Sequence, residues 1–274
     1  HQLVDSIKKA ATKRMLDSLK DLKTNSFDKY KEFWNEYGLV LKEGPAEDHE
    51  NKETIASLML FASTFSNNNS VNQSLDDYVG RMKSDQDKIY FCVADTYEAA
   101  VNSPHIEGLK SKGIEVILLT DRIDEWLMAG LIEYQGKELV NAAKEDIEKE
   151  DTSKKVSEAD QDVIKKIKKH LNEKVSDVVI SSRLTDSASC IVLPKHEPGA
   201  QLRKILEASG QSLGSSNPIF EINIKHKLVK KLKDMKGKQF NAYVDFLYDY
   251  AVIAEGGSPQ DPSRYLRQLD KYLS

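Results

Sequence analysis

The sequence has few of the residues that support a covalent or metal-based framework. The 274-residue chain contains two cysteines, Cys92 and Cys190, and each lies within an apolar run. This placement is typical of buried free thiols in a reducing compartment and does not support a disulfide framework. The six histidines are scattered, without an HExxH motif or a cluster with cysteine. We therefore expect no metal site.

Motifs of nucleotide-binding enzymes are also missing. No GxGxxG segment follows a strand, and GxxxxGK[ST] does not occur. Asp121, Asp124 and Glu125 are conceivable acid–base groups, but acids at the start of a helix are more often solvated partners of the helix dipole. We therefore expect no catalytic residues in this chain.

The chain lacks a strong excess of charge of either sign and lacks long apolar runs. Its 40 basic and 44 acidic residues give a net charge of −4, which argues against broad electrostatic binding of nucleic acid. No apolar run approaches the roughly 20 residues of a membrane span, so we expect no membrane partner. The start at His1, without a signal peptide, indicates part of a longer, cytoplasmic protein.

The first 73 residues predict helices. Apolar residues recur at helical spacing through residues 1–37, most strongly among the aromatic residues between Phe27 and Tyr37. Gly38 is a plausible helix end, and residues 39–53 read as a loop broken at Gly44-Pro45. A further helix is expected from about Lys52. Residues 66–74 have turn composition and indicate a boundary.

Residues 74–140 change to an α/β pattern. Ser74, followed three residues later by Asp77, resembles a capping box. Residues 88–94 and 114–120 are compact apolar runs typical of buried strands, and short helices are expected between them up to Gly113. A strand–helix–strand order predicts a parallel sheet with helices packed against it.

The remaining residues predict a charged linker and then a mixed α+β domain. In residues 141–172 the first half reads as a linker, and Val163, Ile164, Ile167 and Leu171 mark one face of a helix in the second half. Strands are expected at 174–181, 189–194 and 218–224. Helices are expected at 199–209, 225–234, 240–254 and 261–273, the last capped by Asp261. The fold class is therefore α/β followed by α+β.

The last two helices raise the question of what covers their apolar sides. The final helix spans about 12 residues, a length that is marginal alone in water. Packing against two helices of a symmetric partner would give a dimeric four-helix bundle. The alternative, equally open from the sequence, is that both helices pack back on their own domain. The expected contact residues are Phe240, Val244, Leu247, Tyr248, Ala251, Tyr265, Leu266, Leu269 and Leu273.

Several segments together resemble one protein family. SLDDYV (74–79) and LLTDRIDEW (118–126) resemble the middle domain of the heat-shock protein 90 chaperones. YKEFWNEYGLVLKEGPAED (30–48) resembles the bacterial form of the helical connector, and the segments from 174 onward resemble the C-terminal dimerisation domain. The resemblance covers essentially the whole chain. It implies a connector at 1–73, an α/β module at 74–140, a charged linker and helix at 141–172, and a dimerisation domain at 173–274.

The resemblance implies a function for the chain. The family consists of ATP-dependent chaperones that bind unfolded or partly folded client proteins and assist their folding. The matching segments exclude the ATP-binding domain, so we expect no enzymatic activity and no cofactor here, although the whole family uses ATP and Mg²⁺. Expected partners are a second copy of the chain, client proteins and other bacterial chaperones.

The resemblance also points to two client-contacting segments. Trp126, Leu127 and Met128 match an apolar helix that the family exposes to clients. The helix at 198–209 matches a second such segment, with Leu202, Ile205 and Leu206 as its apolar residues. From periodicity alone, both sets are at least as consistent with packing against the chain's own core.

Two other functions stay open. The chain could be a structural dimerisation module without a client role. It could also be a flavodoxin-like ligand-binding enzyme domain, with a site near Ala94-Asp95 and Thr120-Asp121 at the ends of the two strands. The missing phosphate-binding loop argues against the second alternative.

Overall fold

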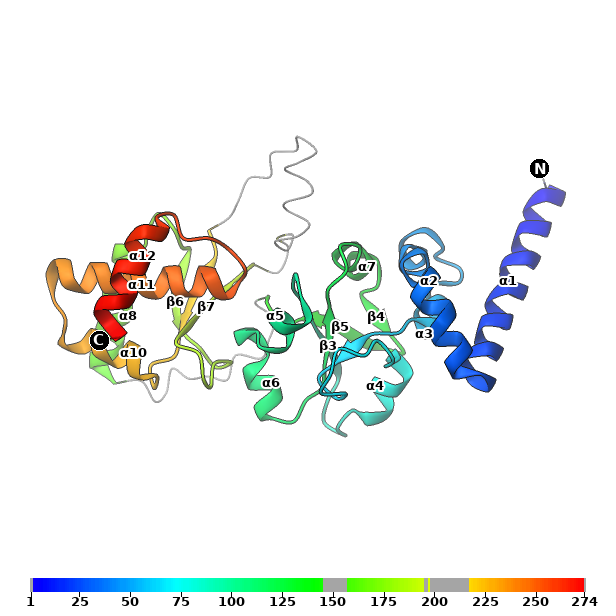
Figure 1. The fold of residues 1–274 in the computed structure, drawn as a ribbon, viewed down its shortest axis with the longest axis horizontal. Coiled ribbons are helices and arrows are strands. Elements are labelled where there is room, and N and C mark those ends of the chain that lie inside the picture. Colours follow the sequence, from blue (N-terminus) through cyan, green and yellow to red (C-terminus); the bar gives the residue numbers. More distant parts are fainter. Residues whose placement is uncertain (1, 145–156, 195–196, 198–216, 274) are drawn as a thin grey trace. The chain divides into compact units, whose positions relative to one another are not determined.

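The computed structural model describes residues 2–144, 157–194, 197 and 217–273 (Figure 1). The chain divides into two compact units. The first unit comprises residues 1–89 and 121–139, and the second comprises residues 90–120 and 140–274. The domain boundaries expected at 73, 140 and 172 stay predictions.

Helices make up most of the first unit. They are α1 (Gln2–Asn25), α2 (Phe27–Glu47), α3 (Lys52–Leu58), α4 (Leu75–Arg81) and α7 (Asp124–Gly130). α2 buries Tyr30 and Trp34, which lie one turn apart on the same face. The Tyr30 hydroxyl donates a hydrogen bond to the carbonyl of Leu58 at the end of α3, which joins the two helices.

Helix α2 corrects the prediction that a helix ends at Gly38. It continues through Gly38 and Pro45 to Glu47, so the predicted loop at 39–53 is wrong over most of its length. A Cβ at Gly38 would lie 2.7 Å from Cε2 of Trp34, so this glycine makes room for the indole ring. Pro45 lies in the last turn of the helix, where it has no N–H to donate to the carbonyl of Leu41, and the helix ends two residues later.

The predicted start of α4 is confirmed. The Ser74 hydroxyl accepts a hydrogen bond from the Asp77 N–H at 3.1 Å, and the Asp77 carboxylate accepts one from the Ser74 N–H at 3.0 Å. This reciprocal capping box satisfies backbone donors that a helix start otherwise leaves unpaired.

A five-stranded sheet has the order β1-β3-β2-β5-β4. The strands are β1 (Ala62–Ser63), β2 (Lys88–Val93), β3 (Val116–Leu119), β4 (Glu133–Tyr134) and β5 (Lys137–Asn141). β2 and β3 pair in parallel, as expected. Between them the chain forms three short helices, α5 (Tyr97–Val101), η1 (Pro104–Ile106) and α6 (Glu107–Ser111). β4 and β5 pair antiparallel, so the sheet is mixed.

The second unit contains a three-stranded sheet covered by helices. Its strands are β6 (Asp177–Ile180), β7 (Ser189–Val192) and β8 (Ile219–Ile222). They have the order β6-β8-β7, with β8 parallel to β6 and antiparallel to β7. Its later helices are α8 (Glu158–His170), α10 (Lys227–Lys230), η3 (Lys231–Asp234), α11 (Gly237–Ala254) and α12 (Pro262–Leu273).

One carboxylate fastens α6 to the turn between β6 and β7. Glu107 accepts hydrogen bonds from the N–H groups of Thr185 at 2.8 Å, Asp186 at 2.9 Å and Ser187 at 3.1 Å. The Ser187 hydroxyl donates another at 2.5 Å. At the neighbouring position, a Cβ on Gly108 would lie 2.9 Å from the carbonyl oxygen of Arg183, so the helix and the turn approach closely.

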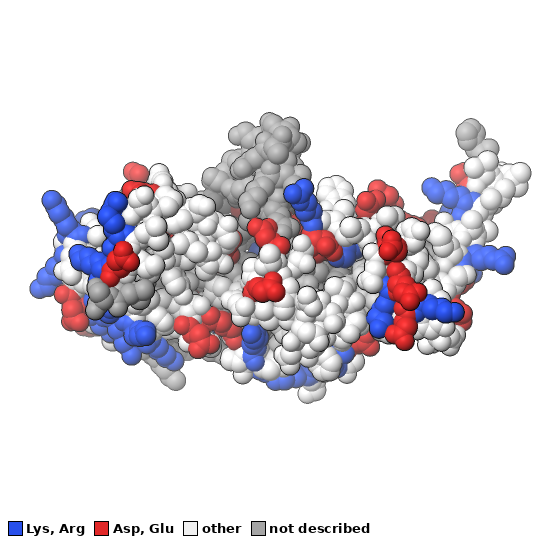
Figure 2. All heavy atoms as spheres, viewed as in Figure 1, with Lys and Arg blue, Asp and Glu red and all other residues white. Residues whose placement is uncertain are grey.

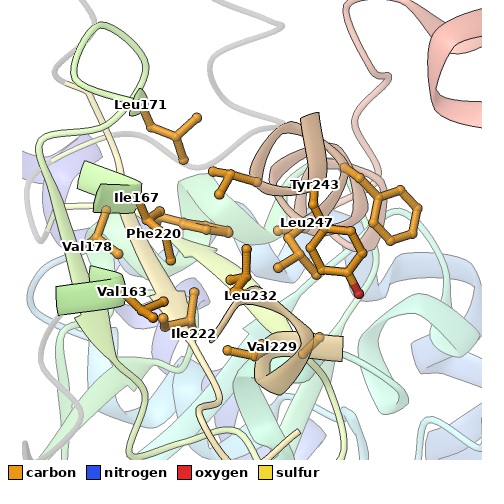
Figure 3. Packing of buried hydrophobic residues seen from close by; sticks show 14 of the residues in the cluster. Val163, Ile167, Leu171, Val178, Phe220, Ile222, Val229, Leu232, Tyr243 and Leu247 are labelled. Carbon is orange, nitrogen blue, oxygen red and sulfur yellow. The ribbon is translucent and has the colours of Figure 1, made fainter. Parts of the chain in front are cut away.

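Charged side chains of both signs are scattered over the face seen in Figure 2, in line with the even composition. The core of the second unit lies beneath them. Figure 3 shows Val163 and Ile167 of α8, Phe220 and Ile222 of β8, and Leu247 of α11 directed toward one another. The predicted buried face of α8 is therefore confirmed, and its solvent side carries acidic residues in the first half and lysines in the second.

The described chain is a mixed α+β protein with two mixed sheets. Cys92 and Cys190 are buried and free, as the sequence predicted. Within the described ranges, every helix is too short or too polar to cross a membrane.

Candidate functional site

Helix α7 carries the first set of residues predicted to contact clients. Trp126 is 54% exposed, whereas Leu127 is fully buried and Met128 is 8% exposed. The helical repeat separates these neighbours, because residues 127 and 128 share the inward face with residues 124 and 131. The prediction of one exposed surface is therefore wrong for Leu127 and Met128. Trp126 is the one of the three that faces solvent.

A buried cluster of charged residues holds the start of α7. Lys42 Nζ of α2 lies 2.7 Å from Asp121 Oδ2 and 2.6 Å from Asp124 Oδ1. The other oxygen of Asp124 accepts a hydrogen bond from the Asp121 N–H at 2.8 Å. The side chains of Lys42 and Asp124 are 5% and 1% exposed. We call these three residues the Lys42 cluster.

The electrostatics of the Lys42 cluster follow from its burial. Loss of hydration raises the pKa of the Asp124 carboxyl, and the nearby Lys42 ammonium opposes this effect without reversing it. The charged form of Asp124 therefore depends on Lys42 for compensation. The expectation that Asp124 is a solvated partner of the helix dipole is wrong.

Helix α2 packs against α7 and also exposes apolar residues. A Cβ at Gly130 would lie 3.2 Å from Cα of Ala46, so the two helices approach closely at this point. Leu39 and Val40, on the solvent side of α2, are both more than half exposed. The first unit thus presents large apolar side chains on both members of a tightly packed helix pair.

The second set of predicted client-contacting residues lies outside the described residues. This set consists of Leu202, Ile205 and Leu206, within 198–216. Their role stays a prediction.

Helix α11 places most of its predicted dimerisation residues in the core of its own unit. Phe240, Val244, Leu247 and Ala251 are buried in this core, and Tyr248 packs edge-on against Phe220 with ring centroids 5.7 Å apart. The Ser189 hydroxyl of β7 also donates a hydrogen bond to the Leu247 carbonyl at 2.9 Å. Their own sheet covers the four buried residues in the single chain, and their part in an intermolecular contact stays a prediction.

Helix α12 packs on the remaining aromatic side of α11. Tyr265 stacks on Phe246 at 5.5 Å between ring centroids, and Tyr272 meets Tyr243 edge-on at 4.6 Å. Leu269 is half-buried at the same core, whereas Leu266 is 58% exposed. Leu273 is the last residue of the helix. A single chain thus covers α12 only in part.

A buried carboxylate joins these two helices. Asp249 of α11 is almost fully buried and lies 3.1 Å from Nη2 of Arg264 in α12. The Gln268 amide donates a hydrogen bond to the Ala242 carbonyl at 2.9 Å. The predicted cap of α12 is confirmed, since Asp261 accepts a hydrogen bond from the Arg264 N–H at 2.9 Å.

Comparison with known proteins identifies the family of this chain. The family model described as Hsp90 protein matches residues 1–274. The chain belongs to the Hsp90 family. Three Hsp90 relatives illustrate the similarity, all named Chaperone protein HtpG. That of Legionella pneumophila (strain Lens) is 45% identical over 276 residues, which cover 98% of this chain and 44% of the relative.

The other two relatives give similar values. The protein of Colwellia psychrerythraea is 44% identical over 282 residues, covering 100% of this chain and 43% of the relative. The protein of Chromobacterium violaceum is 43% identical over 279 residues, covering 98% and 44%. The chain therefore spans less than half the length of these Hsp90 relatives.

Sequence reasoning missed Lys42, although a signal for it was present. Tyr30, Trp34, Gly38 and Lys42 follow one another at intervals of four residues, and all four are buried on α2 of this Hsp90 chain. A lysine that continues a buried stripe requires a carboxylate partner. The acidic turn of the LLTDRIDEW segment supplies two.

The described residues contain no group of three or more His, Cys, Asp or Glu side chains arranged to hold a metal ion. At the strand end favoured by the flavodoxin-like alternative, the Asp121 carboxylate is already paired with Lys42. Membership of the Hsp90 family gives that alternative no support.

Proposed function

We propose that this chain is the client-contacting and dimerising part of an ATP-dependent, cytoplasmic molecular chaperone of the bacterial Hsp90 type. The observation that carries the proposal is the exposed Trp126 on a helix anchored by the Lys42 cluster. Binding of ATP and Mg²⁺, and the closure of a dimer around a client, belong to the proposed activity of the whole protein.

The exposed indole suits weak binding of many partly folded chains. An aromatic side chain offers roughly 200 Å² of surface, so covering the exposed half of Trp126 stabilises a complex by about 2–3 kcal/mol. This contribution is too small to bind one client tightly. It is adequate for a surface that must also release its clients, because large apolar groups give contact area without requiring one partner shape.

The terminal helices support the proposed dimer. Leu266 of α12 and Ile253 of α11 remain exposed after α12 has packed on its own unit. A second copy of the chain would cover them. Two linked copies would present two weak client-binding surfaces to one client, and the linkage raises the effective concentration of the second surface.

A structural dimerisation module without a client role is the alternative. It would account for α12 but leave the exposure of Trp126 without a purpose. The two functions differ in what they predict for Trp126→Arg, because a structural module does not need the indole.

We expect Trp126→Arg to weaken suppression of aggregation of a heat-denatured test protein by about thirtyfold or more, which corresponds to the lost 2–3 kcal/mol. Light scattering of the test protein at increasing chaperone concentration measures this change. The melting temperature should stay the same, because the side chain is more than half exposed.

Met15→Arg is the matched control. Met15 lies on α1, is 59% exposed, and should leave suppression unchanged. Equal suppression by the Trp126→Arg variant and the wild type would contradict the client role and favour the structural alternative.

A further inference from the structure

Two stretches of the second unit are rich in lysine. Residues 165–174 and 225–238 together contain twelve lysines, against the acids Glu173 and Asp234. Their formal charge is +10 within a chain whose net charge is −4, so the other residues together carry −14. This segregation of charge is hidden in the even overall composition.

The fold brings the two stretches together. α8 and η3 lie side by side, and Lys233 Nζ lies 2.7 Å from Asp160 Oδ1. Ile167 of α8 and Leu232 of η3 point into the same core, as Figure 3 shows. With the apolar residues turned inward, the lysines of both stretches point to solvent. We call them the lysine surface.

The lysine surface is mostly unneutralised. Every one of its lysines except Lys174 is exposed. Among the described residues, three of the twelve have an ion-pair partner: Lys168 with Asp177, Lys174 with Asp245 and Lys233 with Asp160. In the view of Figure 2, basic side chains gather over α10 and the adjoining η3.

This arrangement differs from an ordinary solvated helix face. Such faces usually combine opposite charges at a spacing of four residues, as Asp162 and Lys166 do, whereas Lys165 and Lys169 repel each other at this spacing. Like charges within about 10 Å of one another also raise the local potential, because screening is incomplete over this distance. A bound polyanion would relieve both effects.

The chemistry of the surface favours an acidic polypeptide as that polyanion. Neither stretch contains an arginine, the residue best suited to bidentate phosphate contacts. Neither contains a Phe, Tyr or Trp, the side chains on which single-stranded bases stack best or with which a helix inserts into a bilayer. The part of α8 that belongs to the lysine surface, residues 165–170, extends over about 9 Å, the length of about three extended residues.

We propose that the lysine surface binds short acidic segments of partner polypeptides. This inference is independent of client contact at Trp126. The surface acts through its field rather than through shaped pockets, so binding is fast, weakly selective in sequence and strongly dependent on salt.

The test uses the whole chain and a fluorescein-labelled peptide of alternating glutamate and aspartate, about 12 residues long. Fluorescence anisotropy should give saturable binding at about 50 mM NaCl that weakens at least tenfold at about 300 mM. Lys165→Glu/Lys169→Glu/Lys230→Glu should weaken binding about tenfold, because it reverses charge on both stretches.

Lys13→Glu/Lys20→Glu/Lys29→Glu is the matched control. It changes the net charge by the same amount at exposed lysines of α1 and α2, and should alter binding less than about twofold. If the first triple variant loses its circular dichroism melt, the corresponding Lys→Gln triple variant takes its place, with an expected weakening of about threefold.

Other outcomes would overturn the proposal. Absence of saturable peptide binding at low salt would show that the surface is only solvated charge. Equal weakening in both triple variants would show a response to net charge alone. Tighter binding of single-stranded DNA of equal charge, or of phosphatidylglycerol vesicles, would assign the surface to a different class of partner.

Discussion

Lys42 is a charged residue in the interior of the first unit. It reaches Asp121 and Asp124 at 2.7 and 2.6 Å, and its ammonium lies 5.8 Å from the centre of the Phe61 ring. A buried ion pair is not a strong net source of stability, because both charges lose their hydration. Its effect is specific: α7 can begin only where Asp124 meets the lysine, and this fixes the position of Trp126.

We expect Lys42→Met to destabilise the first unit by about 3–5 kcal/mol, because it leaves the Asp124 carboxylate buried without a cation. Both tryptophans, Trp34 and Trp126, belong to this unit. Urea unfolding followed by tryptophan fluorescence therefore reports on it.

The double variant Lys42→Met/Asp124→Leu provides the control. Removing both charges should restore part of the lost stability, since no unpaired carboxylate remains at position 124, while the Asp121 N–H loses its acceptor. A loss below about 1 kcal/mol in the single variant would contradict the account given for the Lys42 cluster.

At the scale of elements, Glu107 connects α6 to the turn between β6 and β7. Burial works to raise the pKa of its carboxyl. Hydrogen bonds from the Ser187 hydroxyl and from the N–H groups of residues 185–187 outweigh this effect, so the pKa is below its ordinary value. A lowered pKa in the folded state means that the ionised carboxylate stabilises the fold.

This stabilisation should depend on pH in a defined direction. It is fully present above the unfolded-state pKa of about 4.3 and is lost as the pH falls through the lower folded-state pKa. Glu107→Gln should therefore destabilise the second unit by about 1–2 kcal/mol near neutral pH, and the difference from wild type should shrink below about pH 4.

Urea unfolding followed by far-ultraviolet circular dichroism, repeated over a pH series, measures this difference. Glu173→Gln, at an exposed position of the same unit, should show little effect at any pH. A difference between Glu107→Gln and wild type that stays constant down to pH 3 would contradict the role of the ionised carboxylate.

At the scale of the whole molecule, the proposed dimer depends on the surface of the terminal helices. α12 covers aromatic residues of α11 and still exposes Leu266. The alternatives expected from the sequence, packing back on the same domain or pairing with a partner, are therefore compatible. The buried residues of α11 pack on their own domain, and the exposed residues of α12 are available for pairing with a partner.

We expect Leu266→Asp to convert a dimer into a monomer, because it places a charge in the proposed interface. Light scattering during size-exclusion chromatography over a dilution series measures the molar mass. The melting curve of the monomer should change little, since Leu266 is 58% exposed in the single chain.

Met15→Asp, an equally exposed position on α1, should leave the molar mass unchanged. A wild-type chain that is monomeric at every concentration would contradict the proposed dimer. It would leave the exposure of Leu266 as an ordinary surface feature.

Element types were predictable wherever the local pattern was strong. The runs predicted as strands at 88–94 and 114–120 form β2 and β3. The face marked by Val163 and Ile167 is the buried side of α8, and the Ser74 capping box lies at the start of α4. The helix end predicted at Gly38 was wrong, because a glycine can mark a helix end or make room for a neighbouring ring. The structure shows the second role, with Trp34 over it.

The sequence by itself determined most of the helices and the longer strands, because backbone propensity and apolar spacing are local properties, and its segments pointed to the Hsp90 family. Only the tertiary structure decided which apolar residues are available to a partner. Leu127 and Val244 are buried, whereas Trp126 and Leu266 are exposed. The same holds for charge: Lys42 and Asp124 are 82 residues apart. Their pairing depends on how α2 and α7 pack, which no local pattern records.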